Sequence, residues 1–291
     1  MMTPADIHAT SIGHIAHQVL RRTPAGSVTG ITSQGIYLQP GGDLTLYLTR
    51  DHFRGPLTIN IRCESGGFSS IQPGEAADFI EDKLIFEVSG QAIHLYKPLI
   101  WKPPSLPGLI RQTSDGYASI FHQVQALHPE HPYLPLLEIV TAGEPFLVND
   151  IPGIEHQLIH LSKSLGTGTP SDIISGMKSI LGAGPGLTPL GDDIVVGVLL
   201  AMTRTRKQVY GPGDMIHIDH TVLSAAEETT TTLSWSLLNC AIQGSADERI
   251  IRVLDGLIAG REIPDRDLES LLNWGSSSGM AVLAGMLLAL P

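Results

Sequence analysis

The residues best suited to chemistry lie in one short segment in the middle of the chain, Gly182 to Asp193. Its sequence is GAGPGLTPLGDD, in which glycines alternate with alanine and proline before two adjacent aspartates. Glycine tolerates positive φ angles and lets backbone N–H groups approach a ligand closely. Successive N–H groups ahead of a helix form a site for an anion. The segment therefore predicts an anion-binding loop, supplied by Gly184, Gly186, Leu187, Thr188 and Gly191.

The two aspartates, Asp192 and Asp193, fall in the first turn of the helix that we expect over 189–204. Thr188 is suited to be its N-cap and Pro189 its first residue. Acidic residues stabilise a helix start by about 0.3–1 kcal/mol each, which is the simplest explanation of the pair. The alternatives are a Mg²⁺ site, a partner for a substrate amide, or a general acid or base. We treat both as candidate catalytic residues because a carbamoyl or ureido group needs acceptors for its N–H groups.

A second loop of small residues, Trp274 to Gly279, precedes another apolar helix. Aligning Gly191 with Gly279 also aligns Gly197 with Gly285, at a constant spacing of 88 residues. Chance and the shared demands of helix packing are one explanation. The other is a pair of equivalent helices, packed through Gly197 and Gly285, whose N-termini meet at one cavity. The second anion site would then consist of Ser276, Ser277, Ser278 and Gly279.

A run of four threonines, Thr229 to Thr232, lies between the two loops in a helical context. Threonine is unfavourable in a helix interior. The hydroxyls either bond back to carbonyls one turn earlier or line a polar pocket. The residues chosen for the pocket are Thr231, Thr232 and Ser234.

Other polar residues carry weaker signals. His156 and His160 are four residues apart, and 217–220 holds two histidines and an aspartate, but neither group has a recognisable zinc signature. Arg62 ends an expected strand, where it could clamp a carboxylate or phosphate or simply be an exposed edge charge. We assign no metal, with Mg²⁺ at the two aspartates as the open alternative.

Two kinds of element must position these residues. Between 27 and 101, short apolar or alternating runs are separated by Gly and Pro turns, which is typical of antiparallel strands in a small barrel or sandwich. Apolar spacing predicts a helix over 5–20 and another around 117–127, and 129–135 is expected to be irregular. The expected strands cover 35–38, 44–48, 57–61 and 84–88.

From residue 154 onward the apolar pattern is helical. The fold class is therefore α+β, with a β-rich N-terminal part and an α-helical C-terminal part. We divide the chain into a mainly β domain with a leading helix over 1–103, a linker and connecting segment over 104–153, and a helical domain over 154–291 that carries both loops. The helices are expected over 155–165, 171–181, 189–204, 217–242, 246–259, 265–273 and 278–290.

Composition predicts a soluble, cytoplasmic protein. The net charge of −11 and the scattered basic residues argue against nucleic acid or anionic membranes as partners. Arg204, Arg206 and Lys207 form the densest basic group, interpreted as the solvated end of a helix. Cys63 and Cys240 predict buried thiols rather than a disulfide. We recognise no secretion signal and no apolar run of about 20 residues that would span a bilayer.

The motif over 182–193, followed by Gly-x-Ser-Ser-Gly-x-x-x-Leu-Ala-Gly ending at Gly285, resembles an uncharacterised-domain family. That family includes the AllH-type subunit of oxamate carbamoyltransferase, from allantoin breakdown. The resemblance covers about 150–291. It implies a multi-subunit enzyme that moves a carbamoyl group between oxalurate and phosphate, yielding oxamate and carbamoyl phosphate, so we expect a small anionic substrate and partner subunits.

The sequence departs from this family at three positions. Leu190 replaces a small polar residue, Ser276 replaces a common histidine, and Ala281 replaces a common aspartate. These departures keep an alternative open: a non-catalytic metabolite-binding or scaffold subunit that docks onto a catalytic partner. A purely structural domain with glycine-rich helix entries is the third interpretation.

Overall fold

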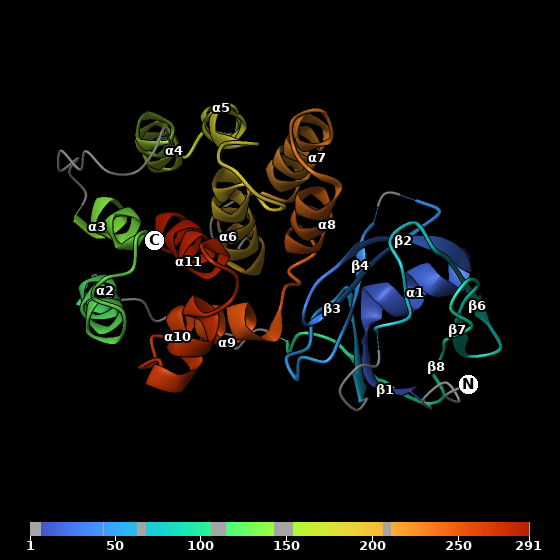
Figure 1. The fold of residues 1–291 in the computed structure, drawn as a ribbon. Coiled ribbons are helices and arrows are strands. Elements are labelled where there is room, and N and C mark those ends of the chain that lie inside the picture. Colours follow the sequence, from blue (N-terminus) through green and yellow to red (C-terminus); the bar gives the residue numbers. More distant parts are fainter. Residues whose placement is uncertain are drawn as a thin grey trace. The chain divides into compact units, whose positions relative to one another are not determined.

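The fold is α+β, as the sequence predicts, and the chain divides into two compact units. The computed structural model describes residues 7–42, 44–62, 68–105, 115–142, 154–205 and 211–290. The first unit, Met1–Pro103, carries the strands and helix α1, and the second, Pro104–Pro291, carries helices α2 to α11 (Figure 1). Both loops singled out in the sequence lie in the second unit.

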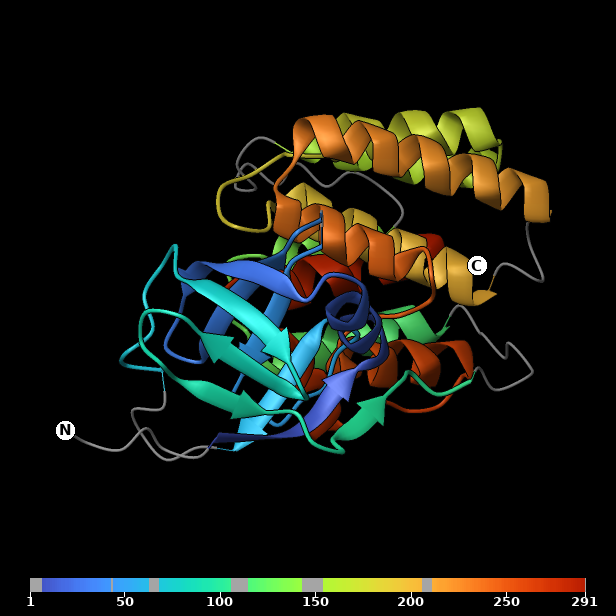
Figure 2. The same cartoon turned by 90° about the vertical axis from the view of Figure 1, so that its right-hand side faces the viewer.

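The first unit is an eight-stranded β-barrel with one additional strand. The sheet order is β5-β4-β3-β2-β6-β7-β8-β1-β9, and antiparallel pairing of β5 with β1 closes the ring (Figure 2). β9 pairs with β1 in parallel. Of the two predicted alternatives, barrel and sandwich, the structure is the barrel. The strands are β1 (Ile7–Gly13), β2 (Ala25–Ile31), β3 (Gly35–Pro40), β4 (Leu46–Thr49), β5 (Thr58–Arg62), β6 (Ala76–Ile80), β7 (Lys83–Phe86), β8 (Ala92–His94) and β9 (Leu99–Trp101).

The predicted helix over 5–20 is wrong in its first half, where β1 precedes α1 (His14–Arg22). Ile7 and Ile12 are buried in the barrel, since β1 pairs with β5, β8 and β9. Sheet pairing on both sides of the strand outweighs the helical spacing of its apolar residues. The chain passes from strand to helix at Gly13. A Cβ on this residue would lie 2.2 Å from the carbonyl oxygens of Gly55 and Pro56.

The helices of the second unit follow the predicted pattern with two differences. The helix expected over 217–242 is two helices, because the chain leaves the helical conformation at Thr230 and Thr231. A helix also begins at Leu134, partly within the segment expected to be irregular; Pro135 is compatible with its first turn. The helices are α2 (Asp115–Leu127), α3 (Leu134–Ala142), α4 (Glu155–Thr167), α5 (Pro170–Ile180), α6 (Leu190–Thr205), α7 (Pro212–Thr229), α8 (Thr232–Ala241), α9 (Glu248–Ile258), α10 (Asp265–Leu272) and α11 (Ser278–Ala289).

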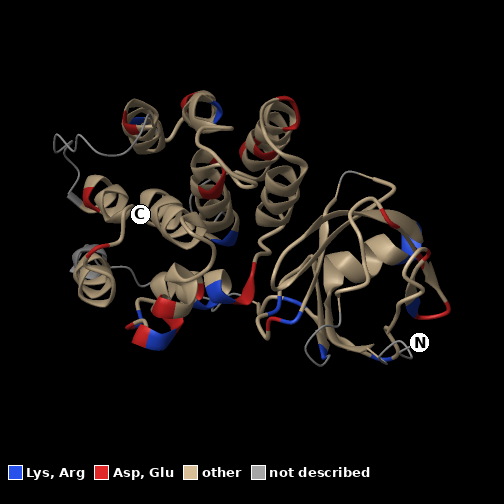
Figure 3. Ribbon diagram, viewed as in Figure 1, with Lys and Arg blue, Asp and Glu red and all other residues tan. Residues whose placement is uncertain are grey.

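Helices α6 and α11 form the centre of the second unit. Every residue of α6 is buried, and so is α11 from Gly279 to Leu287. A Cβ on Gly197 would lie 2.2 Å from the Val282 carbonyl oxygen, and one on Gly285 would lie 2.0 Å from that of Ile194. The two helices therefore pack through these glycines, as the 88-residue repeat predicts. α11 carries no charged residue, which suits a helix enclosed on all sides (Figure 3).

We expect Gly197→Ala to lower the free energy of unfolding by about 1–3 kcal/mol, because the added methyl group meets backbone atoms that cannot rotate away. Urea denaturation of the two proteins measures the difference. Gly213→Ala is the matched control: this glycine lies in α7, and a Cβ added to it would meet no atom within 4 Å, so alanine should be neutral or stabilising. Equal stability of Gly197→Ala and the wild type would contradict the close packing.

The interpretation of Arg204 as a solvated helix end is wrong. Its guanidinium is buried and forms a bidentate ion pair with Asp255, with Nε–Oδ1 and Nη2–Oδ2 distances of 2.8 Å. It also donates to the carbonyl oxygens of Gly244 and Pro104. The planar fork of arginine allows one side chain to satisfy all these acceptors. Arg206 and Lys207 lie outside the described residues.

Two further expectations concern thiols and membranes. Cys240 is a buried free thiol whose pKa is raised by burial, whereas Cys63 lies outside the described residues. Among the helices that the structure describes, none is long and apolar enough to cross a membrane.

Candidate functional site

The loop between α5 and α6 has the conformation that its glycines predict. The φ angles are +73° at Gly182, +107° at Gly184 and +108° at Gly186, values that residues with side chains rarely adopt. The loop is exposed from Gly184 to Leu187. Four backbone N–H groups make no hydrogen bond to any described residue: those of Gly184, Gly186, Leu187 and Thr188.

Three helices begin beside this loop. The hydroxyls of Thr188 and Ser278 hydrogen-bond at 3.2 Å, which places the start of α11 against the start of α6. Thr231, the N-cap of α8, donates its hydroxyl to the Leu187 carbonyl oxygen at 2.7 Å. The first turns of α6, α8 and α11 therefore lie together, and their positive dipole ends point toward one region.

The predicted cap of α6 differs in detail. The helix begins at Leu190, one residue later than expected, and the Thr188 hydroxyl bonds to Ser278 rather than capping the helix. Asp192 and Asp193 nevertheless lie in the first turn, as predicted.

Asp192 is completely buried and has both carboxylate oxygens occupied. The Gly182 N–H donates to Oδ1 at 2.7 Å, and the Thr230 hydroxyl donates to Oδ2. The side chain thereby ties the glycine loop to the junction of α7 and α8. A Cβ on Gly182 would lie 2.4 Å from the Thr229 carbonyl oxygen, so this close approach also requires glycine.

Asp193 is as deeply buried as Asp192 but has no hydrogen-bond partner among the described residues. Burial raises the pKa of its carboxyl group to about 7. The nearby Ser278 and Thr188 hydroxyls oppose this rise without reaching hydrogen-bond geometry, and the charge of Asp192 adds to it. A buried unpartnered carboxyl group is unfavourable for the free protein, which makes Asp193 the strongest candidate for contact with a ligand.

The equivalent glycines Gly191 and Gly279 have a packing role. The Gly191 N–H donates to the Ala183 carbonyl oxygen, and the Gly279 N–H donates to that of Trp274, both at 2.9 Å. A Cβ on either residue would lie 1.9 Å from a carbonyl oxygen of the preceding helix. Neither N–H is available to an anion, so we remove both glycines from the donor set that the sequence suggested.

The serines of the second loop divide by exposure. Ser276 is exposed, whereas Ser277 and Ser278 are half-buried. Ser277 precedes α11 at the N-cap position, but its hydroxyl makes no capping hydrogen bond. Only Ser278 of these three is joined to the first loop by a described hydrogen bond.

The threonine run serves mainly to hold the helices and the loop together. Thr229 bonds back to the Ala225 carbonyl oxygen, and Thr231 caps α8 while contacting the loop. Thr232 is exposed. Ser234 is buried, and its hydroxyl has no partner in the described part of the chain. Sequence reasoning missed Thr230, the residue that bonds Asp192, because it assumed an unbroken helix through the run.

We expect Thr230→Val to lower the free energy of unfolding by about 1–3 kcal/mol, because a buried carboxylate loses one of its two donors. Chemical denaturation measures the change. Thr232→Val is the matched control, since this exposed hydroxyl makes no hydrogen bond within the described residues. If both variants are equally stable, Asp192 is not held by Thr230.

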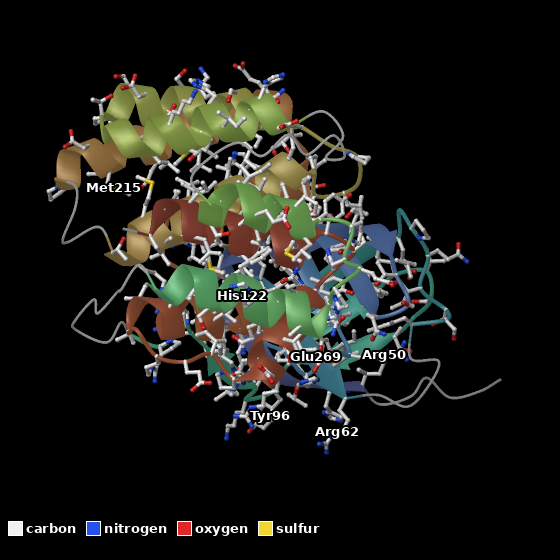
Figure 4. The ribbon with its side chains drawn as sticks, turned by 90° about the vertical axis from the view of Figure 1, so that its left-hand side faces the viewer. Arg50, Arg62, Tyr96, His122, Met215 and Glu269 are labelled. Atoms are coloured by element: carbon white, nitrogen blue, oxygen red, sulfur yellow. The ribbon has the colours of Figure 1, made fainter. Side chains whose placement is uncertain are left out.

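Arg62, a weaker candidate from the sequence, belongs to the first unit. Arg62 is exposed at the end of β5, as Figure 4 shows, which agrees with an edge charge. Asn60 on the same strand is buried, and its amide donates to the carbonyl oxygens of Asp51 and Phe53. No group of three His, Cys, Asp or Glu side chains suited to a metal ion occurs among the residues with a described position.

Comparison with known proteins supports the resemblance seen in the motifs. Residues 180–290 match the family model described as oxamate carbamoyltransferase subunit AllH. The match begins just before the glycine loop and extends through α11, so it includes all three helix starts. The family's name indicates a subunit of a carbamoyltransferase and, with it, partner subunits. No curated protein and no solved structure matches the chain.

Proposed function

We propose that this chain is a subunit of a carbamoyltransferase of the oxamate type and that its substrate binds where α6, α8 and α11 begin. The observation that carries the proposal is Asp193: a buried carboxyl group without a partner among the described residues, placed beside the Thr188–Ser278 pair. Such a group is expected where a ligand supplies the missing hydrogen bonds.

The anionic part of the substrate would bind the loop. Its free N–H groups, including those of Gly186 and Leu187, can donate to phosphate or carboxylate oxygens. The three helix N-termini add positive potential at the same place. Backbone donors fixed in this way need little rearrangement when charge develops on the carbamoyl oxygen or on phosphate during transfer.

Asp193 would act on the carbamoyl group. When phosphate attacks the carbamoyl carbon of oxalurate, the new C–O bond replaces the C–N bond, and the nitrogen of the departing oxamate takes a proton. A neutral Asp193 can donate that proton, and the carboxylate can accept one in the reverse direction, because its pKa of about 7 keeps both forms available.

Asp192 has a different role in this proposal. Both of its oxygens accept hydrogen bonds from the protein, so we assign it to positioning the loop rather than to catalysis. For the same reason, a Mg²⁺ ion at the aspartate pair would have to rely on Asp193 alone.

The alternative is a subunit that binds the metabolite without turning it over. Two features favour it. Ser276 and Ala281 stand where the family that this chain resembles commonly has histidine and aspartate. Ala281 is also fully buried. In this case the loop would still bind the anion, but the proton donor would come from a partner subunit.

An assay of phosphate-dependent cleavage of oxalurate, with the purified chain and with its partner subunits added, tests both candidates. Calorimetric titration of the chain with phosphate, oxamate and carbamoyl phosphate gives binding separately from turnover. The enzyme subunit is supported if substitution of Thr188 or Ser278 weakens binding and substitution of Asp193 abolishes activity of the complex. The metabolite-binding alternative is favoured if the chain binds these ligands but substitution of Asp193 leaves the activity of the complex unchanged. If the chain binds none of the ligands, both candidates are rejected.

A further inference from the structure

A cavity of about 540 Å³ lies within the barrel unit, beside α1. Its apolar lining includes Ile12, Leu20 and Leu95, each at most 5% exposed. Charged side chains line the same cavity: Arg21 from α1 and Lys97 from the β8–β9 connection. Apolar walls with a few polar groups are typical of small-molecule sites.

The other charges come from the turn between β6 and β7. Glu81 and Asp82 form a two-residue hairpin turn, flanked by the pair Ile80 and Lys83, and both contribute to the cavity lining. Their φ angles are +48° and +60°. Such a type I′ turn strongly prefers Asn-Gly, because both central residues have positive φ. The chain instead keeps two carboxylates in a conformation that is unfavourable for them.

The backbone around this cavity is unusual in a second place. Lys97 has a φ angle of +47°. Within the described ranges, Glu81, Asp82 and Lys97 are the only residues other than glycine with positive φ, and all three line this one cavity. Backbone strain of this kind concentrates at ligand sites.

Two hydrogen bonds fix these segments around the cavity. The Leu95 N–H donates to the Asp82 carbonyl oxygen at 2.7 Å, joining the β6–β7 turn to the β8–β9 connection. The Phe79 N–H donates to the Pro24 carbonyl oxygen, joining β6 to the chain that follows α1. The β6–β7 turn, the β8–β9 connection and the segment after α1 are therefore joined by hydrogen bonds around the cavity.

The charges on this rim do not neutralise one another directly. No ion pair joins Arg21 or Lys97 to Glu81, Asp82 or any other residue that the structure describes. The Lys97 ammonium instead lies 5.0 Å from the centre of the Tyr96 ring. Tyr96 is exposed and is labelled in Figure 4. Arg21, Glu81, Asp82 and Lys97 are all exposed residues. The cavity therefore has solvated cations and anions at its rim, none of them paired with a described residue, and an apolar wall below them.

We propose that this cavity binds a small zwitterion, an α-amino acid with an apolar side chain. Its carboxylate would pair with Arg21 or Lys97, its ammonium group with Glu81 or Asp82, and its side chain would contact Ile12, Leu20 and Leu95. This site is independent of the carbamoyltransferase proposal, because all of its residues belong to the barrel unit.

Calorimetric titration of the full chain with L-leucine tests the proposal. Two probes serve as controls for charge: 4-methylpentanoate lacks the ammonium group, and 3-methylbutylamine lacks the carboxylate. We expect saturable binding of L-leucine and at least about tenfold weaker binding of either control. Lack of saturable binding by L-leucine, or equal binding of the three probes, would overturn the proposal.

Variants then locate the site. Arg21→Gln should weaken binding of L-leucine by about tenfold, whereas Arg22→Gln should not, because Arg22 is also exposed but does not line the cavity. The double change Glu81→Asn, Asp82→Gly installs the preferred turn residues and removes both carboxylates. We expect it to raise Tm by about 2–4 °C and to abolish binding. Undiminished binding by this stably folded variant would assign the ligand elsewhere and refute the site.

Discussion

Asp193→Asn is expected to lower kcat for carbamoyl transfer by about 100-fold or more in the complex with partner subunits. Asparagine keeps the shape of the side chain but can neither donate nor accept the catalytic proton. The loop donors do not depend on Asp193, since its oxygens form no hydrogen bond with any described residue. Calorimetry should therefore find phosphate still bound to the variant, and the loss should appear in kcat more than in KM.

The pH profile distinguishes proton transfer from a merely structural effect. The pKa of Asp193 is raised to about 7, so donation of a proton to oxamate should decline as the pH rises through this value. Inorganic phosphate titrates in the same range and changes the profile of both proteins. The difference between the wild-type and Asp193→Asn profiles removes that contribution. A variant with unchanged kcat, or one with the same pH dependence as the wild type, would eliminate Asp193 as the acid.

Much of the second unit could be predicted from sequence because its signals are local. The φ angles of Gly182, Gly184 and Gly186 follow from a property of glycine itself. The contact between Gly197 and Gly285 was indicated by a repeat of small residues, although it joins two distant helices. The glycine angles need no knowledge of what lies around them, and the repeat of small residues is visible in the sequence itself.

The errors arose where distant parts of the chain decide the structure. Helical spacing of Ile7 and Ile12 gave way to a strand, since the partners of β1 come from residues near 60, 93 and 100. Arg204 was mistaken for a solvated residue because its partner, Asp255, is 51 positions away. The same limit applies to Thr230, whose hydrogen-bond partner Asp192 is 38 positions away in the sequence.

The sequence predicted which residues form the site but not which of the two aspartates remains available to a ligand. Asp192 and Asp193 are adjacent and identical in type, yet one has two hydrogen-bond donors and the other has none among the described residues. Burial is equal for both, so burial alone does not separate them. Only the surrounding backbone and hydroxyl groups show which carboxyl group remains available to a ligand.

This difference predicts that Asp193→Asn stabilises the protein at neutral and alkaline pH. A rise of the Asp193 pKa from 3.8 to about 7 on folding corresponds to about 4 kcal/mol. Because the folded state holds this proton more tightly, the stability it contributes is fully present below about pH 4 and is lost as the pH rises to about 7. Asparagine has no charge to bury and avoids this loss.

Urea denaturation of both proteins from pH 4 to pH 8 measures the effect. The variant and the wild type should have similar free energies of unfolding at pH 4, and the variant should be more stable by up to about 4 kcal/mol at pH 8. Titration of all other groups cancels in the difference.

Asp192→Asn is the matched control and should be less stable than the wild type at neutral pH, because an amide cannot accept both of the hydrogen bonds that hold this carboxylate. A variant of Asp193 that is inactive yet more stable would show that this carboxyl group is retained for function at a cost to folding. Destabilisation by both substitutions would instead mean that Asp193 is an ordinary structural residue.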